Sequence, residues 1–162
     1  MQSYIEITGY GYNKRLCEDV ACWFLNEYFP RHEIQLEILH RSLKRDAVFG
    51  YCDCVDYKRR PRNFLIELHT HMERELYIKT LLHELTHLQQ WVTGDLRVKR
   101  GKLYYKESIT DGRDYWSLPH EIEAHAKEDV LYCQYQQYIM NRKILPFHHP
   151  IYDRSKCKSK CP

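Results

Sequence analysis

Two histidines near the middle of the sequence stand four residues apart, with a glutamate directly after the first, as His83-Glu84-Leu85-Thr86-His87. Residues i and i+4 lie one above the other on a helix face, so both imidazoles can reach one ion at a Zn–N distance of about 2.0–2.1 Å. Glu84 misses the ion but can take a proton from a water that the ion activates and later deliver it to a leaving amine. The pattern predicts a site for one Zn²⁺ ion, with His83 and His87 as ligands and Glu84 as the catalytic base. The competing interpretation is a set of polar residues on an exposed helix face.

A catalytic zinc site also needs a third protein ligand and an open fourth position. A metzincin would have a glycine and a further histidine at the positions that Gln90 and Thr93 occupy, so that class is excluded. The segment 119–125, with the sequence PHEIEAH, is rich in donor groups and begins another predicted helix. Its candidate ligands are His120, Glu121, Glu123 and His125. Glu121 and Glu123 point about 200° apart on a helix, so only one of these two can face the ion.

Glu121 and Ala124 follow the stretch HELTHLQQWVTG at 83–94, in the order of the gluzincin pattern H-E-x-x-H and then E-x-x-A. The chain resembles small phage-encoded proteins with a P-x-E-I-E-A signature and, more loosely, the SprT-like and ImmA/IrrE-like metallopeptidases. The resemblance covers mainly residues 81–128. It implies a zincin-like fold of the minimal-gluzincin type, with Glu121 as the third zinc ligand. His125 departs from the pattern, in which Asp or Asn is usual, and is therefore itself a rival ligand.

The resemblance also implies a function, which is the zinc-dependent hydrolysis of peptide bonds in a protein or peptide substrate. It further implies a phage-encoded protein that acts in the host cytoplasm or in association with the virion. Hydrolysis of this kind needs a group besides the metal to stabilise the tetrahedral oxyanion. The candidates near the motif in sequence are Tyr104, Tyr105, Tyr115 and His120. His69 and His71 precede the metal-binding helix and are interpreted as surface residues.

The spacing of apolar residues predicts the elements that position these groups. Apolar residues recur at helical spacing over 14–29, and this helix can be capped by Asn13 and is stopped by Pro30. Three strands are predicted at 34–38, 47–54 and 63–69. We expect the third of these strands to flank the cleft, where its edge could hold an extended peptide.

The metal-binding helix has start and stop signals of its own. Thr70 and Glu73 form a capping box at its beginning, and Gly94 suits a left-handed C-cap directly after its end. A hairpin at 96–105 and a final helix from about 117 to 140 follow. The predicted fold is therefore α+β, with an N-terminal helix, a three-stranded sheet, the H-E-x-x-H helix, a hairpin and a C-terminal helix that carries the third ligand.

Composition places limits on the kind of protein. The 162 residues fit one domain, which we predict at 1–150, followed by a basic tail at 151–162. No apolar run is long enough for a signal peptide or a membrane span, so we expect a cytoplasmic protein without a membrane partner. Seven cysteines cannot all pair internally, and we interpret them as thiols.

A second function remains open at the level of the sequence. The same zinc could be structural, in a binding or regulatory module whose fourth metal position is closed by His120, His125 or a cysteine. Such a module could be associated with nucleic acid, because basic residues cluster at 58–62, 97–102 and 154–160. The formal net charge of +3 is too small to predict nucleic-acid binding by itself.

Overall fold

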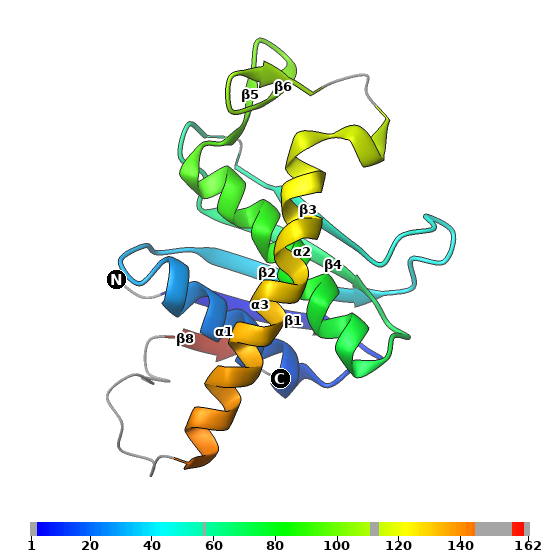
Figure 1. Ribbon diagram of the computed structural model, residues 1–162, viewed down its shortest axis with the longest axis vertical. Coiled ribbons are helices and arrows are strands. Elements are labelled where there is room, and N and C mark those ends of the chain that lie inside the picture. Colours follow the sequence, from blue (N-terminus) through cyan, green and yellow to red (C-terminus); the bar gives the residue numbers. More distant parts are fainter. Residues whose placement is uncertain (1–2, 57, 111–113, 145–156, 161–162) are drawn as a thin grey trace.

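A computed structural model of the chain describes residues 3–56, 58–110, 114–144 and 157–160, with the backbone alone for 143–144 and 157–160. The described residues form an α+β fold with three helices, a mixed five-stranded sheet and a small antiparallel three-stranded sheet (Figure 1). The elements are β1 (Ser3–Gly9), α1 (Lys14–Tyr28), β2 (Gln35–Arg41), β3 (Gly50–Cys54), β4 (Asn63–His69), α2 (Arg74–Thr93), β5 (Leu96–Lys99), β6 (Lys102–Tyr105), β7 (Ser108–Ile109), the 3-10 turn η1 (Tyr115–Ser117), α3 (Pro119–Ile144) and β8 (Cys157–Lys160). No helix in the described part of the chain is long and apolar enough to cross a membrane.

The larger sheet has the strand order β3-β4-β2-β1-β8. β1 pairs in parallel with β2 and β8, and β2 pairs in parallel with β4, whereas β3 runs antiparallel to β4. Alternate residues of β1, β2 and β4 are buried, so one face of the sheet packs on the core and the other faces outward. Within the described part of the chain, β3 is therefore an edge strand with one unpaired side, and it lies at the same side of the sheet as α2.

The strand predictions were correct for three neighbouring strands of the larger sheet and missed the other two. The predicted strands correspond to β2, β3 and β4, although β3 begins only at Gly50. β1 and β8 were not predicted, and β8 lies within the segment 151–162. The expectation that the strand at 63–69 offers a free edge is wrong, because β4 is paired with β3 on one side and with β2 on the other. The free edge beside α2 belongs to β3.

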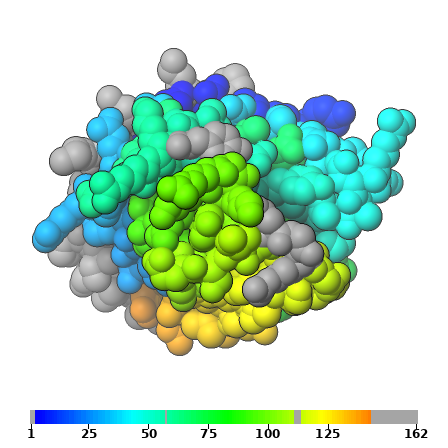
Figure 2. Space-filling model, turned by 90° about the horizontal axis from the view of Figure 1, so that it is seen from above, coloured from blue at the N-terminus to red at the C-terminus, as the bar shows by residue number. Residues whose placement is uncertain are grey.

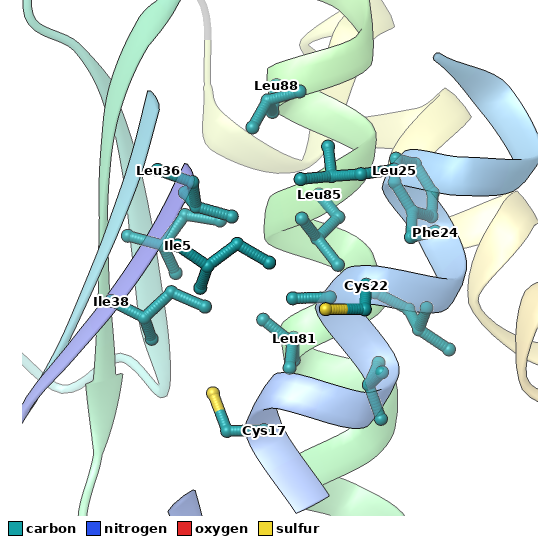
Figure 3. Packing of buried hydrophobic residues seen from close by; sticks show 14 of the residues in the cluster. Ile5, Cys17, Cys22, Phe24, Leu25, Leu36, Ile38, Leu81, Leu85 and Leu88 are labelled. Carbon is teal, nitrogen blue, oxygen red and sulfur yellow. The ribbon is translucent and has the colours of Figure 1, made fainter. Parts of the chain in front are cut away.

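The core lies between the sheet and the helices α1 and α2 (Figure 3). Its labelled members are Ile5, Cys17, Cys22, Phe24, Leu25, Leu36, Ile38, Leu81, Leu85 and Leu88. The three leucines of α2 recur at helical spacing and face the sheet, so the opposite side of the same helix is left for polar residues. α3 packs across the outside of α1 and α2 (Figure 1). Tyr135 of α3 is fully buried against Trp23 and donates a hydrogen bond to Asp19.

The helix ends agree only partly with their sequence signals. The Oδ1 atom of Asn13 accepts a hydrogen bond from the backbone N–H of Leu16, which confirms the predicted cap of α1. Gly94 has φ of 84° and ends α2 in the left-handed conformation, as predicted. The capping box is wrong, because Glu73 is the N-cap of α2 and makes no side-chain cap hydrogen bond. Thr70, three residues earlier, is instead buried against Gly11.

The predicted hairpin at 96–105 is formed by β5 and β6, and β7 adds a third short strand. Its turn residues Arg100 and Gly101 have φ values of 53° and 74°, the pair of positive angles that a tight two-residue hairpin requires. Figure 2 looks down on this small sheet, which covers the end of the molecule beside the first turns of α3. The hairpin thus lies next to the part of α3 that carries the candidate ligands.

Candidate metal centre

His83 and His87 come from the middle of α2, and Glu121 comes from the first turn of α3. Their exposed fractions are 6%, 7% and 8%, although each is polar or charged. Ala124 is fully buried three residues after Glu121, on the face of α3 that packs on α2. The small side chain at this position suits the close approach of the two helices that brings the three donors together.

The three donor atoms lie at the corners of a small triangle. The Nε2 atoms of His83 and His87 are 3.0 Å apart, and Oε2 of Glu121 lies 3.2 Å from the first and 3.3 Å from the second. Two ligands of a tetrahedral ion with bonds of about 2.0–2.1 Å are separated by about 3.3 Å. The triangle therefore has nearly the size of one face of such a tetrahedron, and these residues could hold a metal ion.

The rival third ligands make other contacts. Glu123 points to the hairpin side, where it accepts hydrogen bonds from the hydroxyl of Tyr105 and from Nε2 of Gln90, the latter at 2.9 Å. His125 bonds through Nδ1 to Glu128 and belongs to the surroundings of His83. His120 is buried beside the triangle, with its Nε2 atom 3.6 Å from Oε1 of Glu121. Of the four candidates that the sequence left open, Glu121 is the one that joins both histidines.

Charges in the triangle are strongly coupled. Burial by itself lowers the pKa of His83, but hydrogen bonds to Glu121 and Glu128 outweigh this effect and raise that pKa to about 9. Burial by itself raises the pKa of Glu121, but His83 and His87 hold it well below its usual range. Glu121 is thus ionised, and its negative charge is balanced by protons on the imidazole rings. A bound cation would supply the balancing charge in place of those protons.

Two side chains outside the triangle hold the histidine rings in place. Oε1 of Glu128 lies 2.7 Å from Nδ1 of His83, and Oε1 of Gln90 lies 2.9 Å from Nδ1 of His87. When a cation replaces the protons between the rings, Nδ1 can donate to these oxygens and each Nε2 atom is left free to bind the metal. The sequence interpretation missed both supporting residues. The spacing of Glu128, seven residues after Glu121 and hence on the same helix face, is the signal that could have found it.

A second grouping of donors includes His83, His125 and Glu128. Oε1 of Glu128 lies 2.7 Å from the Nδ1 atoms of both histidines, which is a hydrogen-bond distance and much shorter than the edge of a ligand tetrahedron. In this grouping, Glu128 is therefore a hydrogen-bond acceptor that His83 and His125 share. His125 in turn stacks on Trp116 of η1, with ring centroids 5.3 Å apart. Position 125, where the resemblance implies Asp or Asn, thus carries a histidine that shares the Glu128 carboxylate with His83.

Glu84 has a different environment from the histidines on either side of it. Its side chain is 5% exposed and lies directly against Gly50 of β3. Burial raises the pKa of Glu84 to about 7, although His87 and His83 act in the opposite direction. A carboxylate with a pKa near neutrality can both accept and return a proton, which is what a general base in hydrolysis must do.

Two of the four candidates for oxyanion stabilisation border the triangle. The hydroxyl of Tyr115 donates a hydrogen bond of 2.8 Å to Oε2 of Glu121, the same oxygen that faces both histidines. His120 is buried next to the site, and its Nδ1 atom has no hydrogen-bond partner among the residues that the structure describes. Tyr104 and Tyr105 belong to β6 in the hairpin, and Tyr105 is occupied with Glu123.

Other residues singled out in the sequence lie elsewhere. His69 is buried, and its Nδ1 atom accepts a hydrogen bond from the backbone of Leu43, so the surface interpretation holds only for His71. No cysteine belongs to a metal-donor grouping among the described residues. In the basic clusters, Arg97 pairs with Glu107 at 3.0 Å, and the basic positions 154 and 156 lie outside the described residues.

Comparisons with known proteins give no relatives for this chain. The sequence matches no protein-family model, and no curated protein or solved structure is significantly similar to it. The case for a metal centre therefore rests on the donor geometry of His83, His87 and Glu121, which could hold an ion.

Proposed function

We propose that this protein is a zinc-dependent metallopeptidase of the minimal-gluzincin type, with a zincin-like fold. The observation that supports the proposal most strongly is the arrangement of three buried donors at tetrahedral spacing with a buried carboxylate beside them. Two histidines and one carboxylate are a donor set that zinc accepts in catalytic sites, where three protein ligands leave one position open. Glu84 stands next to His83 in sequence and is not part of the donor triangle, so it is free to handle protons.

Zinc held by these donors would polarise the scissile carbonyl and lower the pKa of a water at the open position. The protein's own groups carry out the proton transfers. Glu84 accepts the proton of the attacking water and delivers it to the nitrogen of the leaving amine. The hydroxyl of Tyr115 borders the site and can donate to the oxygen that becomes negative during the attack. Glu128 and Gln90 keep the two histidine rings in a fixed orientation.

The free edge of β3 supports a peptide as substrate. The carbonyl of Phe49 accepts from the backbone of His69, and the N–H of Val55 donates to Asn63, so the odd-numbered residues of this strand bond to β4. The backbone groups of even-numbered residues such as Gly50 therefore point away from the sheet. An extended peptide could pair with them as an added strand, beside the helix that carries Glu84. This role, first expected for the strand at 63–69, passes to β3.

A non-catalytic zinc module, with or without a nucleic-acid partner, is the second candidate. One observation favours it, which is that His120 is buried near the triangle and has a ring nitrogen that bonds to none of the described residues. A shift of this ring could close the fourth metal position. Cobalt substitution separates the two candidates, because the absorption bands of an open site change when a hydroxamate is added, whereas those of a closed site do not.

Hydrolysis itself is tested with zinc-loaded protein and a set of internally quenched peptides of varied sequence. We expect cleavage by the parent protein, and a loss of about 100-fold or more in the rate with the Glu84→Gln variant at unchanged zinc content. Cleavage by Glu84→Gln at the parental rate would show that Glu84 is not the base. A parent that binds zinc, ignores the hydroxamate and cleaves none of the peptides would favour the non-catalytic module.

A further inference from the structure

Gly50, the first residue of the edge strand β3, lies directly over the side chain of Glu84. A Cβ atom at position 50 would stand 2.6 Å from Oε1, 2.9 Å from Cγ and 3.0 Å from Cδ of Glu84. Real Cβ atoms do not approach other heavy atoms this closely, and all three of the nearest atoms belong to the one side chain. Any residue other than glycine would therefore displace Glu84.

The backbone does not need a glycine at this position. Positive φ angles occur at Gly9, Gly11, Gly94 and Gly101, whereas the backbone of Gly50 is not in this region. Within a strand, glycine lowers stability because it packs no side chain and has more freedom in the unfolded chain. The remaining reason for glycine at position 50 is the space that its missing side chain leaves for Glu84.

We propose that Gly50 is a positioning residue, which lets β3 lie flat on α2 and holds the Glu84 carboxylate at the place where it meets the substrate. This inference rests on the proposed function, because it assigns the purpose of Gly50 through the role of Glu84 as base. The strand closes over the Glu84 side chain, and the same glycine turns its own backbone N–H and carbonyl to the free edge. Gly50 thereby sets the distance between a peptide paired with β3 and the carboxylate beneath it.

The first test is the Gly50→Ala variant of the full chain, compared with Asp53→Ala on the same strand. Asp53 is exposed and points to the other side of the sheet, so its variant controls for a general effect on β3. We expect Gly50→Ala to keep its zinc content and KM and to lose about 100-fold in kcat, because a displacement of about 1 Å can cost this much. Asp53→Ala should keep the parental zinc content, KM and kcat. A crystal structure of Gly50→Ala should have Glu84 in a different rotamer.

A second variant keeps the test decisive if Gly50→Ala folds poorly. Glu84→Ala removes Cγ, Cδ and Oε1, the three atoms that a Cβ at position 50 would meet. The double variant Gly50→Ala, Glu84→Ala should therefore regain stability relative to Gly50→Ala, and the two substitutions should be strongly non-additive in the free energy of unfolding. Additive effects, or a double variant that also fails to fold, would overturn the inference.

The outcomes separate this inference from the proposed function. A parent protein that cleaves no peptide would contradict the proposed function, while the position of Glu84 in the Gly50→Ala crystal structure would still decide whether Gly50 makes room for it. Parental kcat with Glu84 unmoved in Gly50→Ala would overturn the positioning role alone. Loss of zinc from Gly50→Ala would also overturn it, because Gly50 would then be required for metal binding and not only for the position of Glu84.

Discussion

Nδ1 of His83 lies 2.7 Å from Oε1 of Glu128, a contact between the middle of α2 and the third turn of α3 that spans 45 positions of sequence. The same oxygen is 2.7 Å from Nδ1 of His125. One carboxylate thus fixes the tautomer and orientation of a candidate ligand from behind. Because Glu121 and Glu128 lie on the same face of α3, one helix supplies both a donor and the support for a donor on the neighbouring helix.

Replacement of Glu128 should weaken metal binding without removing a donor. We expect Glu128→Ala to lower the zinc affinity by about 10- to 100-fold, because the ring of His83 loses the acceptor that orients it. Competition with a chelator of known affinity measures this change. Asp129→Ala is the control, since Asp129 bonds to Lys79 on the outside of the helix pair and should leave the affinity unchanged. Equal affinities of the parent and Glu128→Ala would contradict the supporting role.

The choice between Glu121 and Glu123 as third ligand can be decided by a matched pair of variants. Glu121→Ala should lose most of its bound zinc after dialysis, because one corner of the donor triangle is gone. Glu123→Ala should retain one zinc per chain, although it loses the bonds to Tyr105 and Gln90. Zinc retained by Glu121→Ala and lost by Glu123→Ala would reverse the assignment.

Tyr115 is the best placed of the four predicted oxyanion donors. Tyr115→Phe removes the hydroxyl next to the donor triangle and should lower kcat by about 10²- to 10³-fold at unchanged zinc content. Tyr105→Phe is a suitable comparison. The hydroxyl of Tyr105 bonds to Glu123, next to the hairpin and away from the donor triangle, so its removal should change kcat little. A parental kcat for Tyr115→Phe would remove this residue from the mechanism.

Zinc should stabilise the folded protein through these residues. A ligand that binds only the native state adds about 2.7 kcal/mol to the free energy of unfolding when its free concentration is 100 times its Kd. We therefore expect zinc to raise the Tm of the metal-free parent and to leave the Tm of His83→Ala nearly unchanged, as measured by scanning calorimetry. An equal rise in both proteins would place the bound zinc elsewhere.

Local signals in the sequence predicted local features of the fold well. Asn13 caps α1 and Gly94 ends α2, because each depends only on its immediate neighbours in the chain. The capping box failed for a long-range reason, since Thr70 is buried against Gly11, on a segment far away in sequence. The strand β1 was missed although Ile5 and Ile7 alternate with polar residues as a strand requires.

The site was predictable where its members share one helix. His83, Glu84 and His87 follow from helical spacing alone, but the position of Glu121 depends on how α3 crosses α2, and its choice came from a resemblance. The contact between Gly50 and Glu84 depends on which strand forms the sheet edge. Because the predicted sheet lacked β1 and gave a free edge to β4, no pattern in the sequence pointed to that glycine.

The central claim is that His83, His87 and Glu121 bind one zinc ion, and elemental mass spectrometry tests it most directly. The protein should be purified without a tag and without chelator, beside a His83→Ala variant prepared in the same way. We predict one zinc per chain in the parent and almost none in the variant. A parent without zinc, even after incubation with zinc, would contradict the metal centre and with it the proposed hydrolysis.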